Sequence, residues 1–218
     1  MANHLDLEEQ EQLDQIKHFW KQYGNVITWC LVAVLGAFAA WNGYQYWQRN
    51  QASQAAALYD DIDKVARSGD GQKLERAFSE MKDRFGSTAY AQQSALVVAK
   101  NLYEAGQVDG AKSALVWASE KSGDTGIASV AKLRLSAVLM DAKSYDEALK
   151  ALDNGISEEF SALVADRRGD VLSAQGKKIE AKIEYMKAYK ALEDRADYKR
   201  LVEIKLNALG VNPAEAPK

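Results

Sequence analysis

Residues that could support acid–base or metal chemistry are few in this sequence, and their spacing keeps them apart. His4 and His18 are the only histidines, and Cys30 is the only cysteine. A transition-metal site needs three or four such ligands in one place, which this set cannot supply. We therefore expect no metal, no cofactor and no catalytic residue, and we interpret the chain as a protein that is not an enzyme.

Two kinds of local pattern resemble ligand loops but lack the residues that such loops require. Asp60, Asp61 and Asp63 form an acidic run without the alternating acids and central glycine of a calcium loop. The segments 68–71 and 122–126 contain glycine and hydroxyl residues, yet neither carries the lysine of a phosphate loop. We interpret the acidic run as a solvated helix face and the two glycine-containing segments as turns.

The element that must position everything else is an uncharged stretch near the N-terminus. Between Lys21 and Arg49 no residue carries a formal charge, and apolar side chains would surround a helix on all sides. About 20 apolar residues suffice to cross a hydrocarbon core of about 30 Å. Aromatic residues suited to headgroup depth flank it: Trp20, Tyr23, Trp29, Trp41, Tyr44, Tyr46 and Trp47. We predict a transmembrane helix at residues 23–47.

The alternatives to a membrane anchor are a buried core helix and a cleavable signal peptide. A buried core helix would have a shorter apolar segment, of about 10 to 14 residues. A cleavable signal peptide would fit the small residues around Phe38, but signal peptides begin with a short basic segment. Residues 1–22 are instead acidic, with five acidic and two basic residues. We favour the anchor.

The distribution of basic residues predicts the orientation of this anchor. Lys17 and Lys21 lie directly before the span, whereas only Arg49 follows it until Lys64. Lysine and arginine near a span favour the cytoplasmic side. We therefore expect residues 1–22 to be a cytoplasmic acidic leader in a single-pass type II protein.

The rest of the chain has the composition of an all-helical domain. Basic and acidic residues balance after residue 22, so there is no basic field to hold nucleic acid. Pro213 is the first proline, and no segment alternates apolar and polar residues as a strand would. Amphipathic segments end at glycines or turn-forming residues, and we predict helices within 71–85, 87–106, 108–122, 127–144, 145–154, 157–175, 177–194 and 197–209.

These helices repeat in pairs. Ala77, Ala111, Ala148 and Ala181 occupy equivalent places in successive pairs, at steps of 34, 37 and 33 residues. A tetratricopeptide repeat has a period of about 34 residues, and small residues let its two helices approach. We predict an α-solenoid of about four helical hairpins over residues 48–210, capped by the helix at 197–209 and followed by a disordered tail at 211–218.

A solenoid of this kind has a concave surface, which the first helix of each pair would line. A clamp for a peptide carboxylate would need lysine and asparagine there, whereas leucine, alanine and aspartate predominate. We expect apolar segments of a client or partner to bind instead. The candidate groove residues are Gln93, Leu96, Lys100, Tyr103, Val130, Leu133, Ala137, Met140, Leu163, Asp166 and Asp170.

The order of these parts resembles a known family. An acidic leader ending in QIKHFWKQYG, one span, and a repeat domain containing ADRRGDVLSAQG and EIKLNALG resemble the YfgM-type ancillary subunit of the SecYEG translocon. This resemblance implies a bacterial inner-membrane protein with a cytoplasmic N-terminus and a periplasmic domain. It also implies partners: the SecYEG translocon, the periplasmic chaperone PpiD and exported client polypeptides.

The resulting hypothesis is a non-catalytic interaction subunit that assists exported proteins as they emerge and links the translocon to periplasmic chaperones. Two alternatives stay open. The chain could be a membrane-anchored scaffold for another envelope assembly. The acidic leader could instead dock a cytoplasmic regulator in a stress-signalling complex.

Overall fold

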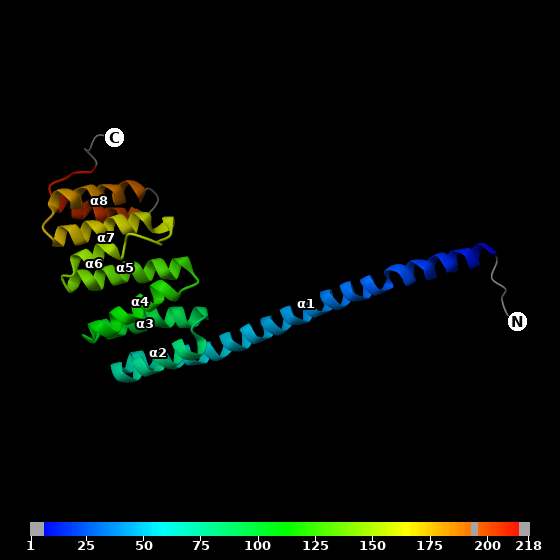
Figure 1. The fold of residues 1–218 in the computed structure, drawn as a ribbon. Coiled ribbons are helices and arrows are strands. Elements are labelled where there is room, and N and C mark those ends of the chain that lie inside the picture. The colour runs from blue at the N-terminus through cyan, green and yellow to red at the C-terminus, as the bar shows by residue number, and fades with distance from the viewer. Residues whose placement is uncertain (1–6, 193–195, 214–218) are drawn as a thin grey trace. The chain divides into compact units, whose positions relative to one another are not determined.

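A computed structural model describes residues 7–192 and 196–213, and all regular structure in these two ranges is helical. This confirms the all-α prediction for the described residues (Figure 1). The elements are α1 (Leu7–Ser68), α2 (Gly71–Phe85), α3 (Ala89–Glu104), α4 (Val108–Lys121), α5 (Thr125–Asp141), α6 (Tyr145–Lys150), the 3₁₀ turn η1 (Glu158–Phe160), α7 (Ser161–Ala174), α8 (Lys178–Ala191) and α9 (Ala196–Ala208).

The chain divides into two compact units, Met1–Asn50 and Gln51–Lys218. The helix α1 contributes residues to both units, because the boundary falls within it. The sequence predicts a similar boundary, because the predicted span ends at residue 47 and the predicted repeat domain begins at residue 48. Most of the predicted tail, residues 214–218, lies outside the described residues.

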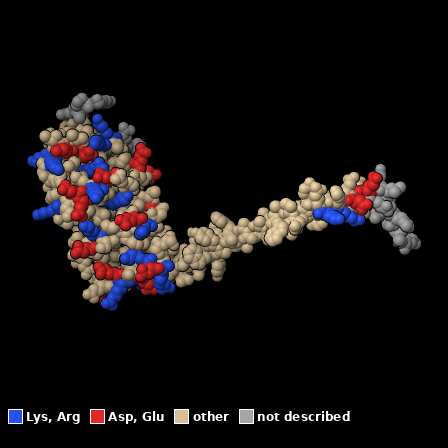
Figure 2. All heavy atoms as spheres, viewed as in Figure 1, with Lys and Arg blue, Asp and Glu red and all other residues tan. Residues whose placement is uncertain are grey.

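The first unit exposes its apolar side chains. Part of α1 is long and apolar enough to cross a membrane, and nearly all of that part is unburied. Val34 and Phe38, for example, are each 66% exposed. Figure 2 shows a stretch of this helix without charged residues, whereas acidic and basic side chains are mixed over the second unit. A core helix of a soluble protein would be buried, so this exposure favours the anchor.

The second unit is a stack of helical hairpins. In Figure 1 the helices from α2 to α8 follow one another along the stack, and α9 packs beside α8. The first pair in chain order is the part of α1 after Asn50 with α2, and Ile62 and Ala66 belong to the same buried cluster as Leu74 and Phe78. The further pairs are α3 with α4, α5 with α6, and α7 with α8. Within the described ranges the helices therefore form about four hairpins and a capping helix, as predicted.

Local sequence signals set most helix ends. Asp70, Thr88 and Asp124 each accept a hydrogen bond from the backbone N–H three residues later, at 3.1, 3.3 and 3.0 Å. Such caps satisfy donors that the first helical turn leaves free. Gly106 and Gly176 follow α3 and α7 with φ of +78° and +79°, which glycine adopts without strain.

The small residues of the repeat lie where its helices meet. Ala111, Ala148 and Ala181 are fully buried. A Cβ placed on Gly169 would lie 2.5 Å from ring atoms of Tyr185, so α7 and α8 approach closely only because Gly169 has no side chain. The small-residue pattern therefore reports real helix contacts.

One helix is shorter than expected. The sequence predicts a helix over residues 145–154, but α6 ends at Lys150. Arg168 of α7 donates hydrogen bonds to the Leu152 carbonyl at 3.2 Å and to Asp153 at 2.9 Å. These contacts fix the chain in a turn just beyond α6.

Candidate partner-binding groove

An apolar groove of about 460 Å³ lies in the second unit, between the first helices of three consecutive pairs. The helices α3, α5 and α7 contribute most of its surface, as expected for the concave face of a repeat stack. It is lined by Ala99, Lys100, Tyr103, Leu115, Val130, Leu133, Arg134, Ala137, Val138, Asp141, Phe160, Leu163 and Arg167.

Helical spacing brings the apolar wall together. Val130, Leu133 and Ala137 follow one another on α5 at steps of three and four residues, which places them on one face of the helix. Leu163 comes from α7, and Phe160 comes from the 3₁₀ turn that leads into it. None of these five side chains is fully buried. They offer apolar surface that a ligand could cover.

Charged side chains line the groove beside this wall. Lys100 comes from α3, Arg134 from α5 and Arg167 from α7, and Asp141 is the only carboxylate among the lining residues. Nη1 of Arg134 donates to the Leu96 carbonyl on α3 at 3.3 Å. Lys100 Nζ is 3.8 Å from Glu104, in a pair whose side chains are mostly exposed.

The carboxylate of Asp141 already has a partner. The Tyr103 hydroxyl donates a hydrogen bond to it. This hydrogen bond is the main reason that the pKa of Tyr103 lies above its ordinary value, with a smaller contribution from desolvation. The pair joins the C-terminal ends of α3 and α5, and the lining as a whole has three cations and one carboxylate.

Sequence reasoning identified part of this lining. Lys100, Tyr103, Val130, Leu133, Ala137 and Leu163 are brought together in the groove. Gln93 is exposed on α3, while Leu96 and Met140 are partly buried against the core. These three residues lie outside the lining, and whether any candidate residue contacts a partner stays a prediction.

Asp166 and Asp170 have partners within the domain rather than in the groove lining. Lys205 of α9 lies 2.7 and 2.9 Å from the two Asp166 oxygens and 2.7 Å from Asp170 Oδ1. The Tyr198 hydroxyl donates to Asp166 at 2.7 Å, and the Tyr185 hydroxyl donates to Asp170 at 2.8 Å. Both carboxylates thus join α7 to the helices that follow it.

The sequence-based candidates do not include seven lining residues, which are Ala99, Leu115, Arg134, Val138, Asp141, Phe160 and Arg167. Arg134 follows Leu133 and lies four residues after Val130, while Arg167 lies four residues after Leu163. Both therefore belong to the same helical stripes as the predicted residues, and that spacing could have found them. Phe160 precedes α7, so no helical stripe included it.

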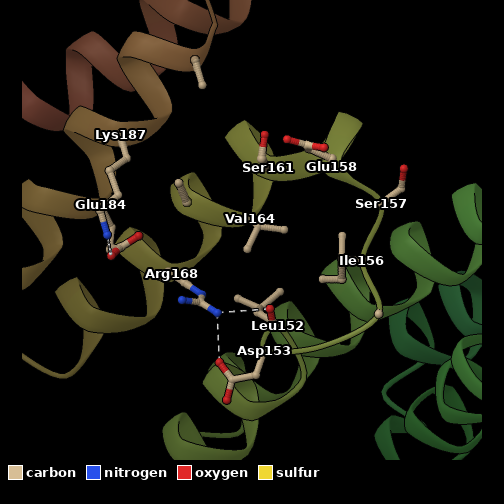
Figure 3. A pocket seen from close by; sticks show the side chains of 13 residues that line it. Leu152, Asp153, Ile156, Ser157, Glu158, Ser161, Val164, Arg168, Glu184 and Lys187 are labelled. Carbon is tan, nitrogen blue, oxygen red and sulfur yellow. Dashed lines mark hydrogen bonds and ion pairs between the residues drawn. The ribbon is translucent and has the colours of Figure 1, made fainter.

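A second cavity, of about 420 Å³, lies between the turn after α6 and the helices α7 and α8. Figure 3 shows that its charged groups largely satisfy one another. Arg168 binds the Leu152 carbonyl and Asp153, and Lys187 lies 2.5 Å from Glu184. This internal pairing leaves less unbalanced charge for a ligand than in the groove.

The groove offers noncovalent binding chemistry. Apolar side chains with a few placed polar groups are typical of ligand pockets. Among the described residues, no group of three or more His, Cys, Asp and Glu residues could hold a metal ion.

Comparison with known proteins covers both units. A family model described as tetratricopeptide repeat-like domain matches residues 17–211. The chain is 32% identical over 213 residues to a Neisseria gonorrhoeae protein named ancillary SecYEG translocon subunit, covering 96% of this chain and 100% of that protein. Proteins with the same name from Haemophilus influenzae and Escherichia coli K12 are 30% and 25% identical, each over 93% of this chain and 98% and 97% of their own length.

Proposed function

The chain belongs to the tetratricopeptide repeat-like domain family and to the ancillary SecYEG translocon subunits, and from this membership we propose that it associates with the translocon in the inner membrane. The observation that carries the proposal is the similarity to relatives of that name over nearly the full length of both proteins. It includes the apolar stretch of α1 as well as the repeat domain. The proposed role is to bind proteins without catalysing a reaction.

We further propose an N-terminus in the cytoplasm and a domain, residues 48–210, in the periplasm. Lys17 and Lys21 before the span support this orientation. Protease added to intact spheroplasts should degrade the domain and leave an epitope tag placed before residue 17 protected. Protection of the domain until the membrane is permeabilised would contradict the orientation.

The proposed mechanism combines tethering with weak binding. The span, at residues 23–47, would hold the domain beside the translocon, where emerging chains are concentrated. A tether of this kind raises the effective concentration of a binding site to the millimolar range without any new contact. The groove between α3, α5 and α7 would hold apolar segments of exported proteins, and the domain would pass them to chaperones such as PpiD.

Site-specific photocrosslinking in living cells tests this proposal. A photoreactive residue at Phe38, exposed in the apolar stretch, should crosslink to a translocon subunit. One at Leu133, in the groove, should crosslink to exported chains or to PpiD. Lys121, exposed at the end of α4 and outside the groove, is the matched control and should give weaker crosslinks.

The pattern of crosslinks separates the alternatives. Loss of all crosslinks to the translocon and to periplasmic chaperones would overturn the proposed function. Crosslinks mainly to envelope-building enzymes would favour the scaffold alternative. Deletion of residues 1–15 addresses the leader, because a role beside the translocon should survive that deletion and a signalling role should not.

A further inference from the structure

The charges around the groove define which segments it would hold. We propose that the groove selects polypeptide segments in which a bulky apolar side chain lies next to carboxylate side chains. This inference rests on the proposed function and specifies the client chemistry.

The apolar part of the proposal follows from the wall of the groove. Val130, Leu133, Phe160 and Leu163 present partly exposed carbon surface in a volume of about 460 Å³. Ligand pockets commonly enclose about 300 to 1,000 Å³. The groove is therefore large enough for bulky side chains, and burying them would supply most of the affinity.

The acidic part follows from the imbalance of charge in the lining. Lys100, Arg134 and Arg167 face one carboxylate, Asp141, which the Tyr103 hydroxyl already engages. The domain as a whole has nearly balanced charge, so this excess is local. A peptide with carboxylates beside its apolar anchor would meet complementary potential, whereas a lysine-rich peptide would be repelled.

The existing partners of the three cations leave them able to bind a ligand. Lys100 and Glu104 are 3.8 Å apart and largely exposed, and such pairs contribute little. Arg134 donates to a neutral carbonyl at 3.3 Å, and Arg167 is 3.5 Å from Asp170. Asp170 also binds Lys205 at 2.7 Å, a shorter contact than its contact with Arg167.

The second cavity provides an internal contrast. Its lining carries Arg168 and Lys187 together with Asp153, Glu158 and Glu184, so cations do not exceed carboxylates there. Arg168 and Lys187 are held by Asp153 and Glu184. Of these two cavities, the groove is therefore the one in which cations outnumber carboxylates.

Peptide binding to the full-length protein in lipid nanodiscs tests the proposal. Four fluorescent peptides share one length and differ only in sequence. Three carry a central leucine pair flanked by glutamates, by glutamines or by lysines. The fourth has the glutamates but serines in place of the leucines. Dissociation constants are measured by fluorescence anisotropy at low and high salt.

We expect the glutamate-flanked leucine peptide to bind about tenfold more tightly than the lysine-flanked one at low salt. The glutamine-flanked peptide should fall between them, and the serine peptide should bind weakly. High salt should narrow the preference, because it shortens the screening length from about 10 Å at 0.1 M to about 3 Å at 1 M.

Two charge-reversal variants locate the preference. Arg134→Glu should abolish or invert the preference for glutamate. Arg76→Glu carries the same change of charge on an exposed residue of α2 outside the groove, and it should leave the preference within twofold. Equal binding of the three leucine peptides, a serine peptide as tight as the leucine peptide, or an unchanged preference in Arg134→Glu would each overturn the proposal.

This outcome is independent of the test of the proposed function. If Phe38 crosslinks to the translocon while the peptides show no preference, the function stands and the client chemistry is wrong. If no position crosslinks to the translocon or to periplasmic chaperones, the proposed function fails whatever the peptides show.

Discussion

At the scale of single residues, the repeat depends on small side chains at helix contacts. Gly169 on α7 faces the ring of Tyr185 on α8, and a methyl group there would lie 2.5 Å from ring atoms. Ala99 on α3 and Ser136 on α5 precede Gly169 at the steps of 37 and 33 residues that also separate Ala111, Ala148 and Ala181, and both are buried. The same repeat position therefore tolerates different sizes, according to the residue that packs against it.

Gly169→Ala should destabilise the domain. Alanine normally stabilises a helix relative to glycine by about 1 kcal/mol. Here the added methyl forces α7 and α8 apart, and overpacking of this kind costs about 1 to 3 kcal/mol. We expect a net loss of up to about 2 kcal/mol in the free energy of unfolding, measured by urea denaturation followed by circular dichroism. In a Tyr185→Leu background, Gly169→Ala should lower the free energy of unfolding by less. An equal loss in both backgrounds would contradict the proposed clash with the Tyr185 ring.

Removing the hydroxyl group from two buried serines on α5 should change the free energy of unfolding in opposite directions. Among the described residues, Ser136 Oγ is buried without a hydrogen-bond partner. Ser129 Oγ donates to the Thr125 carbonyl at 2.6 Å and accepts from the Ser157 N–H at 2.9 Å. Ser136→Ala should raise the free energy of unfolding by about 1 kcal/mol, and Ser129→Ala should lower it by about 1 kcal/mol. Equal changes in the free energy of unfolding for the two variants would contradict the difference in hydrogen bonding between the two serines.

At the scale of elements, α9 is joined to α7 by a partly buried ionic cluster. Asp166 is 2% exposed, and its carboxylate is bound by Lys205 and Tyr198 of α9. Val202 and Leu206 of α9 are fully buried in the same region. The capping helix thus covers the apolar end of the stack and also supplies the countercharge for α7.

Removing the central cation should uncouple this helix. Lys205→Met leaves Asp166 and Asp170 without the ammonium group that they share. Uncompensated buried charge is costly, so we expect a loss of about 3 kcal/mol in the free energy of unfolding. Lys187→Met is the matched control, because its pair with Glu184 involves an exposed lysine and should contribute less than about 1 kcal/mol. A small effect of Lys205→Met would show that the cluster contributes little.

The same cluster predicts a loss of stability at alkaline pH. Burial, with the carboxylates of Asp170 and Asp166, raises the pKa of Tyr185 well above its ordinary value, and burial with the Asp166 hydrogen bond does the same for Tyr198. Above about pH 10 the unfolded chain ionises these tyrosines while the folded chain keeps them neutral. The free energy of unfolding should therefore fall as the pH rises above about 10. Below about pH 10 the ionisation of these two tyrosines should not change it.

Urea denaturation between about pH 8 and pH 11 measures this dependence. Tyr185→Phe and Tyr198→Phe should be less stable at pH 8, because each loses a hydrogen bond. The free energy of unfolding of these two variants should also decline less steeply with rising pH than that of the parent protein. Equal slopes would show that these two hydroxyls do not cause the alkaline loss.

The sequence predicts the positions of the helices better than it predicts which side of each helix is covered by its neighbours. Glycine stops and repeated small residues are local signals, so the helices, their pairing and the cap follow from them. On α7, however, Leu163 and Arg167 line the groove, whereas Asp166 and Asp170 turn toward α9. Helical spacing separates these two stripes, but only the packing of α8 and α9 decides which stripe is covered.

At the scale of the whole molecule, the two units have different environments. The second unit buries its own hydrophobic clusters, whereas the apolar side chains of the first are exposed. Folding of the domain should therefore depend on the residues after Asn50. The first unit should serve to hold the domain at the membrane. These two contributions can be separated by cutting the chain.

A protease site inserted between Asn50 and Gln51, at the boundary of the two units, makes this cut possible. In the proposed orientation the site would be cleaved from the periplasmic side. After cleavage the domain should keep its melting temperature, because its buried clusters lie in residues after the cut. Its crosslinks from Leu133 to exported chains should fall by about tenfold or more, because the effective concentration given by the tether is lost. The uncleaved chain with the same insertion is the control. Undiminished crosslinking would mean that the affinity of the domain alone is sufficient, and a lower melting temperature would mean that the first unit contributes to its stability.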